Sequence, residues 1–509
     1  MIPMALLEEL SRARPGRRVT VDTASTIEAD GVVFAMIGVD GERSLAVAGL
    51  DGAAAGFEVA EVFRAAGRVL GICPLTHENA ERLRRIFPFT APSPLARTAG
   101  SGGTPGATPG ITFGVGDRLG LAGPGHLRAF RTHAASPVLA QQSVRELTLT
   151  GRTFEEVLDC STWATFQEGF REPWGADGDH LKTGDWVRKA LSAGYTMITA
   201  DVSDHIRAEH AARPASEVRS AWAGLDPALR AEIESRYLSR SFPIGGEKAV
   251  RFAEITFKKT VLVYRDAVEH AVRLYRAGLE AAAGRGFDFE LSIDETATPT
   301  TPQAHLFVAM EARQKGVVLT SLAPRFPGEF QKGIDYIGDP ADFRTSFATH
   351  AAIARTLGHR ISVHSGSDKF AVFPSIGELS RGAFHIKTAG TSWLEALRVV
   401  AAKDPGLFRE LYARAMERYD EARKLYHVTP NPAALPTPAE LPDNGAAGLL
   451  DDADARRVLH ITYGEILAVP RLREGFFRLL RSSLPAYWAA LETHIGRHLA
   501  ALGAPERRA

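Results

Sequence analysis

The stretch from Phe287 to Trp393 decides the fold, because it contains four short apolar runs that each end in polar and ionisable residues. The runs lie in FDFELSIDETATPTTPQAHLF (287–307), KGVVLTSLAPRFPGEF (315–330), HRISVHSGSDKF (359–370) and AFHIKTAGTSW (383–393). Each run is followed by a segment that can form a helix. This order predicts parallel βα units, in which functional residues collect where the strands end.

Apolar and polar residues alternate within these runs. Side chains along a strand point to opposite faces with a period of two. The alternation therefore places four polar residues on one face, which is the interior if the sheet closes into a barrel: Asp294, His364, His385 and Lys387. Because burying a polar group without a partner costs roughly 1–3 kcal/mol, we expect these residues to have a function.

The composition is that of an ordinary soluble globular protein. The chain has 509 residues, 45% of them hydrophobic, and its 60 basic and 60 acidic residues give a formal net charge of zero. This length allows two or three domains, or one large domain with insertions. The balanced charge argues against nucleic acid as a partner.

Neither the cysteines nor the apolar segments indicate an exported or membrane protein. Cys73 and Cys160 are too few for a thiolate zinc site and suggest no disulfide framework. The first residues include acidic side chains and have no long apolar core, unlike a signal peptide. No apolar run approaches the roughly 20 residues of a membrane helix. We expect a cytoplasmic protein.

The N-terminal part is predicted to be a small accessory α/β domain spanning residues 1–95. It has helices expected at 5–14, near 57–66 and in HENAERLRRIF (77–87), with strands in VVFAMIG, SLAVAG and VLGICP. Residues 96–110 are rich in Gly, Pro, Ser and Thr, which is typical of a linker. This domain shows no recognisable site.

The rest of the chain is predicted to hold eight strands, which is the number in a TIM (β/α)8 barrel. We expect them near 111–116, 163–168, 195–201, 288–294, 317–322, 361–365, 384–388 and 457–463. The alternative is an open doubly wound sheet.

The barrel is expected to span residues 111–470, which exceeds the usual ~250 residues. A helical insertion at about 205–285 explains the excess, and it could cover the barrel mouth or form contacts in a homo-oligomer. Helices are predicted for residues 471–509.

Glycines at 114, 116 and 120 form the pattern GxGxxxG, which differs from the dinucleotide-binding GxGxxG. They favour a tight exit from the first barrel strand. Asp117 follows this exit and is a candidate for substrate binding.

Three histidines stand at or just after predicted strand ends: His180, His364 and His385. Glu168, Asp294 and Glu295 occupy comparable positions. Imidazole and carboxylate ligands suit a divalent ion such as Zn, Mn, Ni, Co or Fe. The alternative for each histidine is a hydrogen bond to a carbonyl or carboxylate within the barrel.

Four cations are predicted around the same mouth: Lys182, Arg325, Lys369 and Lys387. They suggest an anionic substrate with a carboxylate or phosphate. The alternative is pairing with neighbouring carboxylates. Ser365 and Asp368, which follow His364, complete the candidates for substrate binding. No P-loop is present, which argues against phosphate transfer from ATP.

Long blocks of this sequence resemble the tagaturonate epimerase family. They are SIDETATPTTPQAH, SLAPRFPGEFQKGIDYIGD, ISVHSGSDKF and FHIKTAGTSWLEALR, with GDRLGLAGPGHLRA and DHLKTGDW upstream. The resemblance runs from about Gly110 to the C-terminus.

The resemblance implies a metal-dependent TIM-barrel enzyme that interconverts D-tagaturonate and D-fructuronate in hexuronate catabolism. Related members act on the neutral ketohexoses tagatose and fructose. A keto acid fits the predicted cationic mouth, and its carbonyl and neighbouring hydroxyl suit a Lewis acid.

The carbon to be inverted lies β to the ketone, so enolisation alone does not acidify its C–H bond. Retro-aldol cleavage with rotation of the aldehyde is one route, and hydrogen transfer through a transient ketone is the other. We favour the retro-aldol route. Glu168 and Asp294 would move the hydroxyl proton on the two faces, with His180, His364 and His385 as metal ligands.

Two other classes remain possible on the sequence alone. One is a class II aldolase or a sugar isomerase on the same barrel, which would release fragments or an aldose. The other is a non-catalytic protein that binds sugar acids and has lost the metal.

Overall fold

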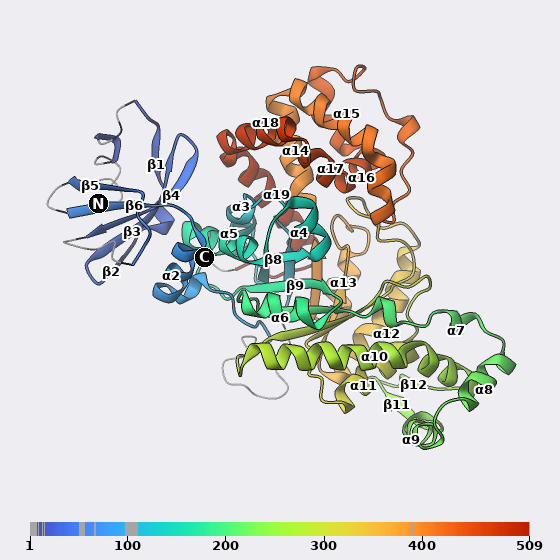
Figure 1. The fold of residues 1–509 in the computed structure, drawn as a ribbon. Helices are drawn as coiled ribbons and strands as arrows, with labels where there is room; N and C mark the ends of the chain where they lie inside the picture. Colours follow the sequence, from blue (N-terminus) through green and yellow to red (C-terminus); the bar gives the residue numbers. More distant parts are fainter. Residues whose placement is uncertain are drawn as a thin grey trace.

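Eight parallel strands close into a barrel at the centre of the molecule (Figure 1). In this computed structural model the described residues are 8, 10–12, 14, 16–49, 56–65, 68–96, 110–388 and 390–507. The barrel strands are β7 (Thr112–Val115), β8 (Ser136–Ser143), β9 (Gly175–Leu181), β10 (Met197–Asp201), β13 (Asp288–Ile293), β14 (Ser321–Pro324), β15 (Arg360–Val363) and β16 (Phe384–Thr388).

The barrel closes through the pairing of β16 with β7. Lys387 lies opposite Gly114 in this pair, and His385 lies opposite Thr112. Neighbouring strands around the ring are parallel, and the order β10-β13-β14-β15-β16-β7-β8-β9 follows the chain. The predicted TIM barrel is confirmed.

Two of the predicted strands were wrong. Residues 163–168 belong to helix α5 (Phe154–Glu168), and 457–463 begin in helix α16 (Ala453–Ile461). Helix α5 starts with a capping box between Thr153 and Glu156 and is buried on most of its surface. A helix with little exposed surface has no polar stripe, so a short stretch of it can imitate the alternation of a strand.

The two missed strands are β8 and β9. Strand β9 has the sequence GADGDHL, which holds two glycines, two aspartates and one alanine. These residue types are depleted in strands. The aspartates of β9 face the barrel interior, where they contact Lys387. The sequence of β9 therefore reflects these contacts and not a preference for extended backbone.

Helices cover the outside of the barrel. They include α6 (Gly184–Ser192), α10 (Glu254–Ala282), α11 (Pro302–Gln314), α12 (Pro340–Leu357) and α13 (Phe373–Ser380). The predicted helical insertion divides into two parts. Its last helix, α10, packs between α6 and α11 and belongs to the barrel wall.

The first part of the insertion lies at the edge of the molecule (Figure 1). It contains α7 (Glu209–Ala212), α8 (Ala215–Ala223), α9 (Pro227–Tyr237) and the hairpin of β11 (Ser241–Pro243) with β12 (Ala249–Arg251). Its proposed use as a lid or in oligomer contacts stays a prediction.

The N-terminal part forms a six-stranded antiparallel sheet beside the barrel (Figure 1). Its strands are β1 (Val19–Val21), β2 (Ile27–Ala29), β3 (Val32–Val39), β4 (Glu42–Gly49), β5 (Glu61–Ala65) and β6 (Arg68–Cys73). The predicted helix near 57–66 was wrong, because β5 pairs with β6. The predicted helix at 77–87 corresponds to α2 (His77–Ile86).

Aromatic side chains join this sheet to the barrel. The ring of Phe87 packs 5.1 Å from that of Phe34 and 5.5 Å from that of Phe166 on α5. Most of the predicted linker (97–109) and part of the predicted helix at 5–14 lie outside the described residues.

Helices after β16 build a second hydrophobic cluster that includes Trp393, Tyr412 and Phe476. They are α14 (Thr391–Lys403), α15 (Pro405–Ala422), α16, α17 (Tyr463–Leu467), α18 (Pro470–Ser482) and α19 (Leu484–Ala501). Helix α19 returns to pack on α3 (Gly123–Thr132) of the barrel. Among the described helices, none is long and apolar enough to cross a membrane.

Three buried histidines form a row beside the barrel. Nε2 of His350 lies 3.0 Å from the carbonyl oxygen of Thr300, which can only accept a hydrogen bond. Burial lowers the pKa of each of the three rings, so the imidazoles are neutral. A neutral His350 that donates from Nε2 accepts at Nδ1 from His305 (2.9 Å), and His305 then accepts at Nε2 from His359 (3.0 Å).

The histidine row makes stability depend on pH. Burial lowers the pKa of His350 and of His359 to about 4, whereas unfolded histidines titrate near ~6.5. Between these values the unfolded chain binds more protons, so the free energy of unfolding falls as the pH is lowered from about 6.5 to about 4.

We predict that His359→Gln, which retains a donor but cannot ionise, reduces the slope of the free energy of unfolding against pH. The reduction should be up to about 1.4 kcal/mol per pH unit, which corresponds to the uptake of one proton. Urea unfolding at a series of pH values measures the slope. Equal slopes for His359→Gln and the wild type would contradict the assignment.

Candidate active site

A cavity of about 420 Å³ opens at the C-terminal ends of the barrel strands. Its wall combines residues from the ends of β8, β9, β13, β14 and β15 with the segment 425–427 that follows α15. Because parallel strands bring their carboxyl ends to one edge, the cavity occupies the usual position of a TIM-barrel active site.

Lys387 of β16 is the central charge of the barrel interior. Its Nζ lies 2.8 Å from Asp177, 2.6 Å from Asp179 and 3.0 Å from Glu290. It also donates a hydrogen bond to Thr199. Burial would lower the pKa of Lys387, but the surrounding carboxylates raise it well above its usual value. This lysine is therefore a fixed cation.

His364 connects this interior network to the cavity. Its Nε2 lies 2.8 Å from Glu290, and its Nδ1 lies 3.1 Å from Oδ2 of Asp294. Burial opposes protonation, but Asp294 and Glu290 together raise the pKa of His364 to about 10. Ser292 donates a 2.6 Å hydrogen bond to Oδ1 of Asp294. The second carboxylate oxygen of Asp294 is thus held beside the imidazole.

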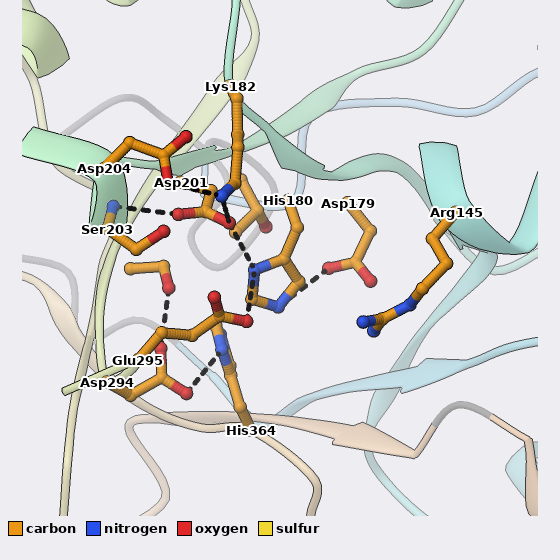
Figure 2. Close-up of polar contacts among 12 residues, drawn as sticks. Arg145, Asp179, His180, Lys182, Asp201, Ser203, Asp204, Asp294, Glu295 and His364 are labelled. Carbon is orange, nitrogen blue, oxygen red and sulfur yellow. Dashed lines mark hydrogen bonds and ion pairs between the residues drawn. The ribbon is translucent and has the colours of Figure 1, made fainter. Parts of the chain in front are cut away.

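The ring of His180 packs edge to face against that of His364, with the ring centroids 4.9 Å apart (Figure 2). Its φ of +53° lies in the left-handed region, which costs a residue other than glycine about 1 kcal/mol or more. Nδ1 of His180 is buried and has no hydrogen-bond partner among the described residues. This strained backbone therefore presents an unsatisfied ligand atom to the cavity.

Two carboxylates surround this imidazole nitrogen. Asp201 lies 3.6 Å and Glu295 4.0 Å from Nδ1 of His180. The ligand atoms of these three residues lie within 4.8 Å of one another. One imidazole and two carboxylates form a suitable donor set for a divalent transition metal.

His385 does not join this group. It lies in the barrel interior, where Nδ1 is 2.9 Å from the Thr112 hydroxyl. Burial lowers the pKa of His385 to about 3, so the ring is neutral. Of the three predicted metal ligands, the structure brings His180 and His364 together and places His385 deeper in the barrel.

Cationic side chains also line the cavity. Arg145, Arg325 and Lys332 line it, and no carboxylate in the described part of the chain lies within ion-pair distance of them. Arg145 donates to the carbonyl oxygen of Leu425 and lies over the Tyr426 ring. Burial, with Arg145 nearby, lowers the pKa of Lys332. These side chains can bind an anion.

Glu168 lies away from the cavity. It ends helix α5 rather than a strand, and its carboxylate pairs with Arg128 at 3.0 Å. Its position at a strand end was the basis for a catalytic role, and that basis is removed. Asp117 accepts hydrogen bonds from the backbone of Leu119, Gly120 and Ala122 and organises the loop after β7.

Asp368 and Lys369 have structural contacts. Lys369 is fully buried and donates to the carbonyl oxygens of Ser367, Gln331 and Ile334, so it ties two loops together. Asp368 pairs with Arg456, and its backbone N–H donates to His498. Asp368, His494 and His498 lie close enough together to suggest a metal site. The hydrogen bond from the Asp368 backbone occupies Nε2 of His498, however, so this nitrogen is not available to a metal ion.

The remaining predicted residues lie at or near the cavity. Ser365 and Arg325 line it. Lys182 pairs with Asp204 at 2.9 Å on the rim. Sequence reasoning missed Lys332, Arg145 and Asp179 as site residues. The Asp179 position could have been found only by identifying β9, and no local pattern marks Lys332 or Arg145.

Comparison with known proteins gives a consistent result. The UxaE family model, described as tagaturonate epimerase, matches residues 23–502. The tagaturonate/fructuronate epimerase of Thermotoga maritima is 39% identical over 486 residues, which is 95% of this chain and 97% of that protein.

Solved structures extend the similarity to the whole fold. A glycerol complex of the fructuronate-tagaturonate epimerase UxaE from Cohnella laeviribosi superposes with a TM-score of 0.91 at 43% identity and covers 99% of each chain. The native crystal structure of the same Cohnella protein gives 0.90 at 42% identity, again over 99% of each chain.

We predict that Lys387→Met destabilises the protein by about 3–5 kcal/mol, because it leaves buried carboxylates without their cation. Urea unfolding measures the change. Lys315→Met removes a partly exposed ion pair with Glu269 and should cost less than about 1 kcal/mol. If the two substitutions had equal effects, Lys387 would not neutralise the interior.

Proposed function

Because this chain belongs to the tagaturonate epimerase family, we propose that it interconverts D-tagaturonate and D-fructuronate. Epimerases are isomerases, so the chain is an enzyme of that class. The family argues against the aldolase and non-catalytic alternatives.

The observation that supports this substrate is that the cavity wall combines two chemically different kinds of group. Imidazole and carboxylate groups come from His180, Asp294 and Glu295. Arg145, Arg325 and Lys332 are cationic and lack carboxylate partners within ion-pair distance among the described residues. A ligand with a carboxylate at one end and polar carbonyl and hydroxyl groups at the other can use both kinds.

A hexuronate with a ketone has this distribution of groups. Its carboxylate and its ketone are at opposite ends of the carbon chain, and the carbon to be inverted lies between them. We place the carboxylate against Lys332 and Arg145, where charge-assisted hydrogen bonds form. The ketone and its neighbouring hydroxyl then lie beside His180.

A divalent ion fits the group formed by His180 and its neighbouring carboxylates. His180, Asp201 and Glu295 would hold it, because the unpartnered Nδ1 of His180 and two carboxylates converge there. When bound, Zn, Mn, Ni, Co or Fe would act as a Lewis acid toward the ketone oxygen.

The pair of His364 and Asp294 is placed to move the hydroxyl proton at the inverted carbon. Glu290 fixes one side of the imidazole and Ser292 fixes one carboxylate oxygen. Nδ1 of His364 and Oδ2 of Asp294 lie 3.1 Å apart, so a substrate hydroxyl that reaches this pair can exchange its proton with them. This rigid support reduces reorganisation during the proton transfer.

In the retro-aldol route this proton transfer begins the cleavage of a carbon–carbon bond and completes its re-formation. Removal of the hydroxyl proton allows the bond between the inverted carbon and the carbon α to the ketone to break. The inverted carbon becomes an aldehyde, and the fragment with the ketone becomes an enediolate. The aldehyde rotates, the bond forms again on its other face, and the proton returns to the new alkoxide. No atom is gained or lost, and no oxidant is needed.

The defining experiment incubates the purified protein with tagaturonate, fructuronate, tagatose and fructose, and separates the products by chromatography. Parallel samples contain EDTA, with or without added Mn or Ni. We expect interconversion of the two uronates that EDTA abolishes and metal restores. Three-carbon fragments as final products, or interconversion of the neutral sugars alone, would contradict the proposal.

We predict that Lys332→Met raises the KM for tagaturonate at least tenfold, since a hydrogen bond to a charged group contributes about 1.5–3 kcal/mol. The inhibition constant of neutral tagatose should change less than about threefold. Steady-state kinetics measure both values. Lys424→Met, at an exposed lysine paired with Glu421, serves as the control, and equal effects on both sugars would exclude Lys332 as a carboxylate ligand.

We predict that Asp294→Asn lowers kcat at least 100-fold while the KM for the uronates changes only a fewfold, because proton transfer contributes roughly 10²–10⁴ in rate. Initial rates in both directions test this. Asp342→Asn at an exposed site on α12 provides a matched control. Wild-type turnover by Asp294→Asn would remove this residue from the proton-transfer pair.

A further inference from the structure

Gln141 lies at the floor of the cavity with both amide atoms unpaired. It belongs to β8, lies opposite Asp177 in the sheet, and is 1% exposed. Neither its Oε1 nor its Nε2 has a hydrogen-bond partner within the described residues. An unpaired buried amide costs roughly 1–3 kcal/mol or more, so this position requires an explanation.

Few residues in the cavity wall share this property. Within the described ranges, buried side-chain atoms without a partner occur at three cavity-lining positions: Gln141, His180 and His364. The two histidines are already assigned to the ketone and the proton transfer. Gln141 is set deeper, because its partner Asp177 precedes His180 by three residues along β9.

The backbone of β7 makes room for this amide. A Cβ atom on Gly114 would lie 1.7 Å from Oε1 of Gln141, which is an impossible approach, so only glycine leaves this space. The same Cβ would lie 3.5 Å from the ring of His385. Gly114 therefore allows Gln141 to occupy the barrel interior rather than serving only as a loop exit.

An epimerase has a specific need for such a group. The hydroxyl on the inverted carbon points in different directions in the two epimers, and a buried hydroxyl loses affinity when it has no partner. His364 and Asp294 provide a partner for one direction. An amide both donates and accepts, so it can hold the oxygen as a hydroxyl or as an aldehyde carbonyl.

We propose that the Gln141 amide is the second hydroxyl site, which binds the oxygen of the inverted carbon in one of the two epimers. This inference rests on the proposed function and makes Gln141 a substrate-binding residue that determines how the two epimers are held.

The test is Gln141→Met, which keeps the side-chain length and removes both hydrogen-bonding atoms. We expect the KM for one epimer to rise at least tenfold while the KM for the other stays within twofold. The equilibrium ratio of the two uronates must remain that of the wild type, so kcat changes to compensate. Initial rates with each pure uronate measure the four constants.

Gln142→Met is the matched control. Gln142 is the next residue on β8 and equally buried, but it does not line the cavity, and its Oε1 accepts a hydrogen bond from Arg152. Its two KM values should remain within twofold of the wild type. Gly114→Ala is an independent variant, because the new methyl group displaces the flexible end of Gln141, and we expect the same asymmetry.

Equal changes in both KM values, or no change in either, for both Gln141→Met and Gly114→Ala would overturn the inference. Gly114→Ala decides the matter if Gln141→Met does not fold. Failure of the wild-type protein and Gln142→Met to interconvert the uronates would instead overturn the proposed function, which distinguishes the two failures.

Discussion

The neutralisation of buried carboxylates by Lys387 is the interaction on which the site depends. TIM barrels are usually filled with branched apolar side chains, yet Asp177, Asp179 and Glu290 converge here on one ammonium group. Without it, three carboxylates could not remain ionised together in such a small volume. Glu290 then orients His364, so the charge balance of the interior determines the geometry of the cavity.

The parts predicted best from sequence are those where burial and periodicity agree. Strands β13, β15 and β16 were identified because apolar residues alternate with polar ones, and this placed His364 and Lys387 inside the barrel. Strand β9 was missed because its inward positions carry aspartates and its other positions carry small residues. Glu168 was wrongly assigned to a strand because α5 is buried on most of its surface, and a short stretch of it shows the alternation expected of a strand.

Pairing between distant side chains could not be predicted from sequence. Several lysines and arginines stand in or near the blocks that end in the site, but their partners decide their roles. Lys387 is held by carboxylates and Lys369 by carbonyl oxygens, whereas Lys332 has no carboxylate within ion-pair distance among the described residues. Sequence shows that cations are present, and only the fold shows which of them remains available to an anionic substrate.

The C-terminal helices give the site a particular order of assembly during synthesis. Strand β7 must wait for β16, whose His385 contacts Thr112 from 273 residues away. Even then the cavity lacks Tyr426 in its wall, and Arg118 lacks the carbonyl of His460 that holds it. A chain still emerging from the ribosome thus has all eight strands before it has a complete binding site. Because such long-range closure is slow, the nascent protein exposes the polar interior of an unfinished barrel together with the apolar face of α3 that α19 later covers.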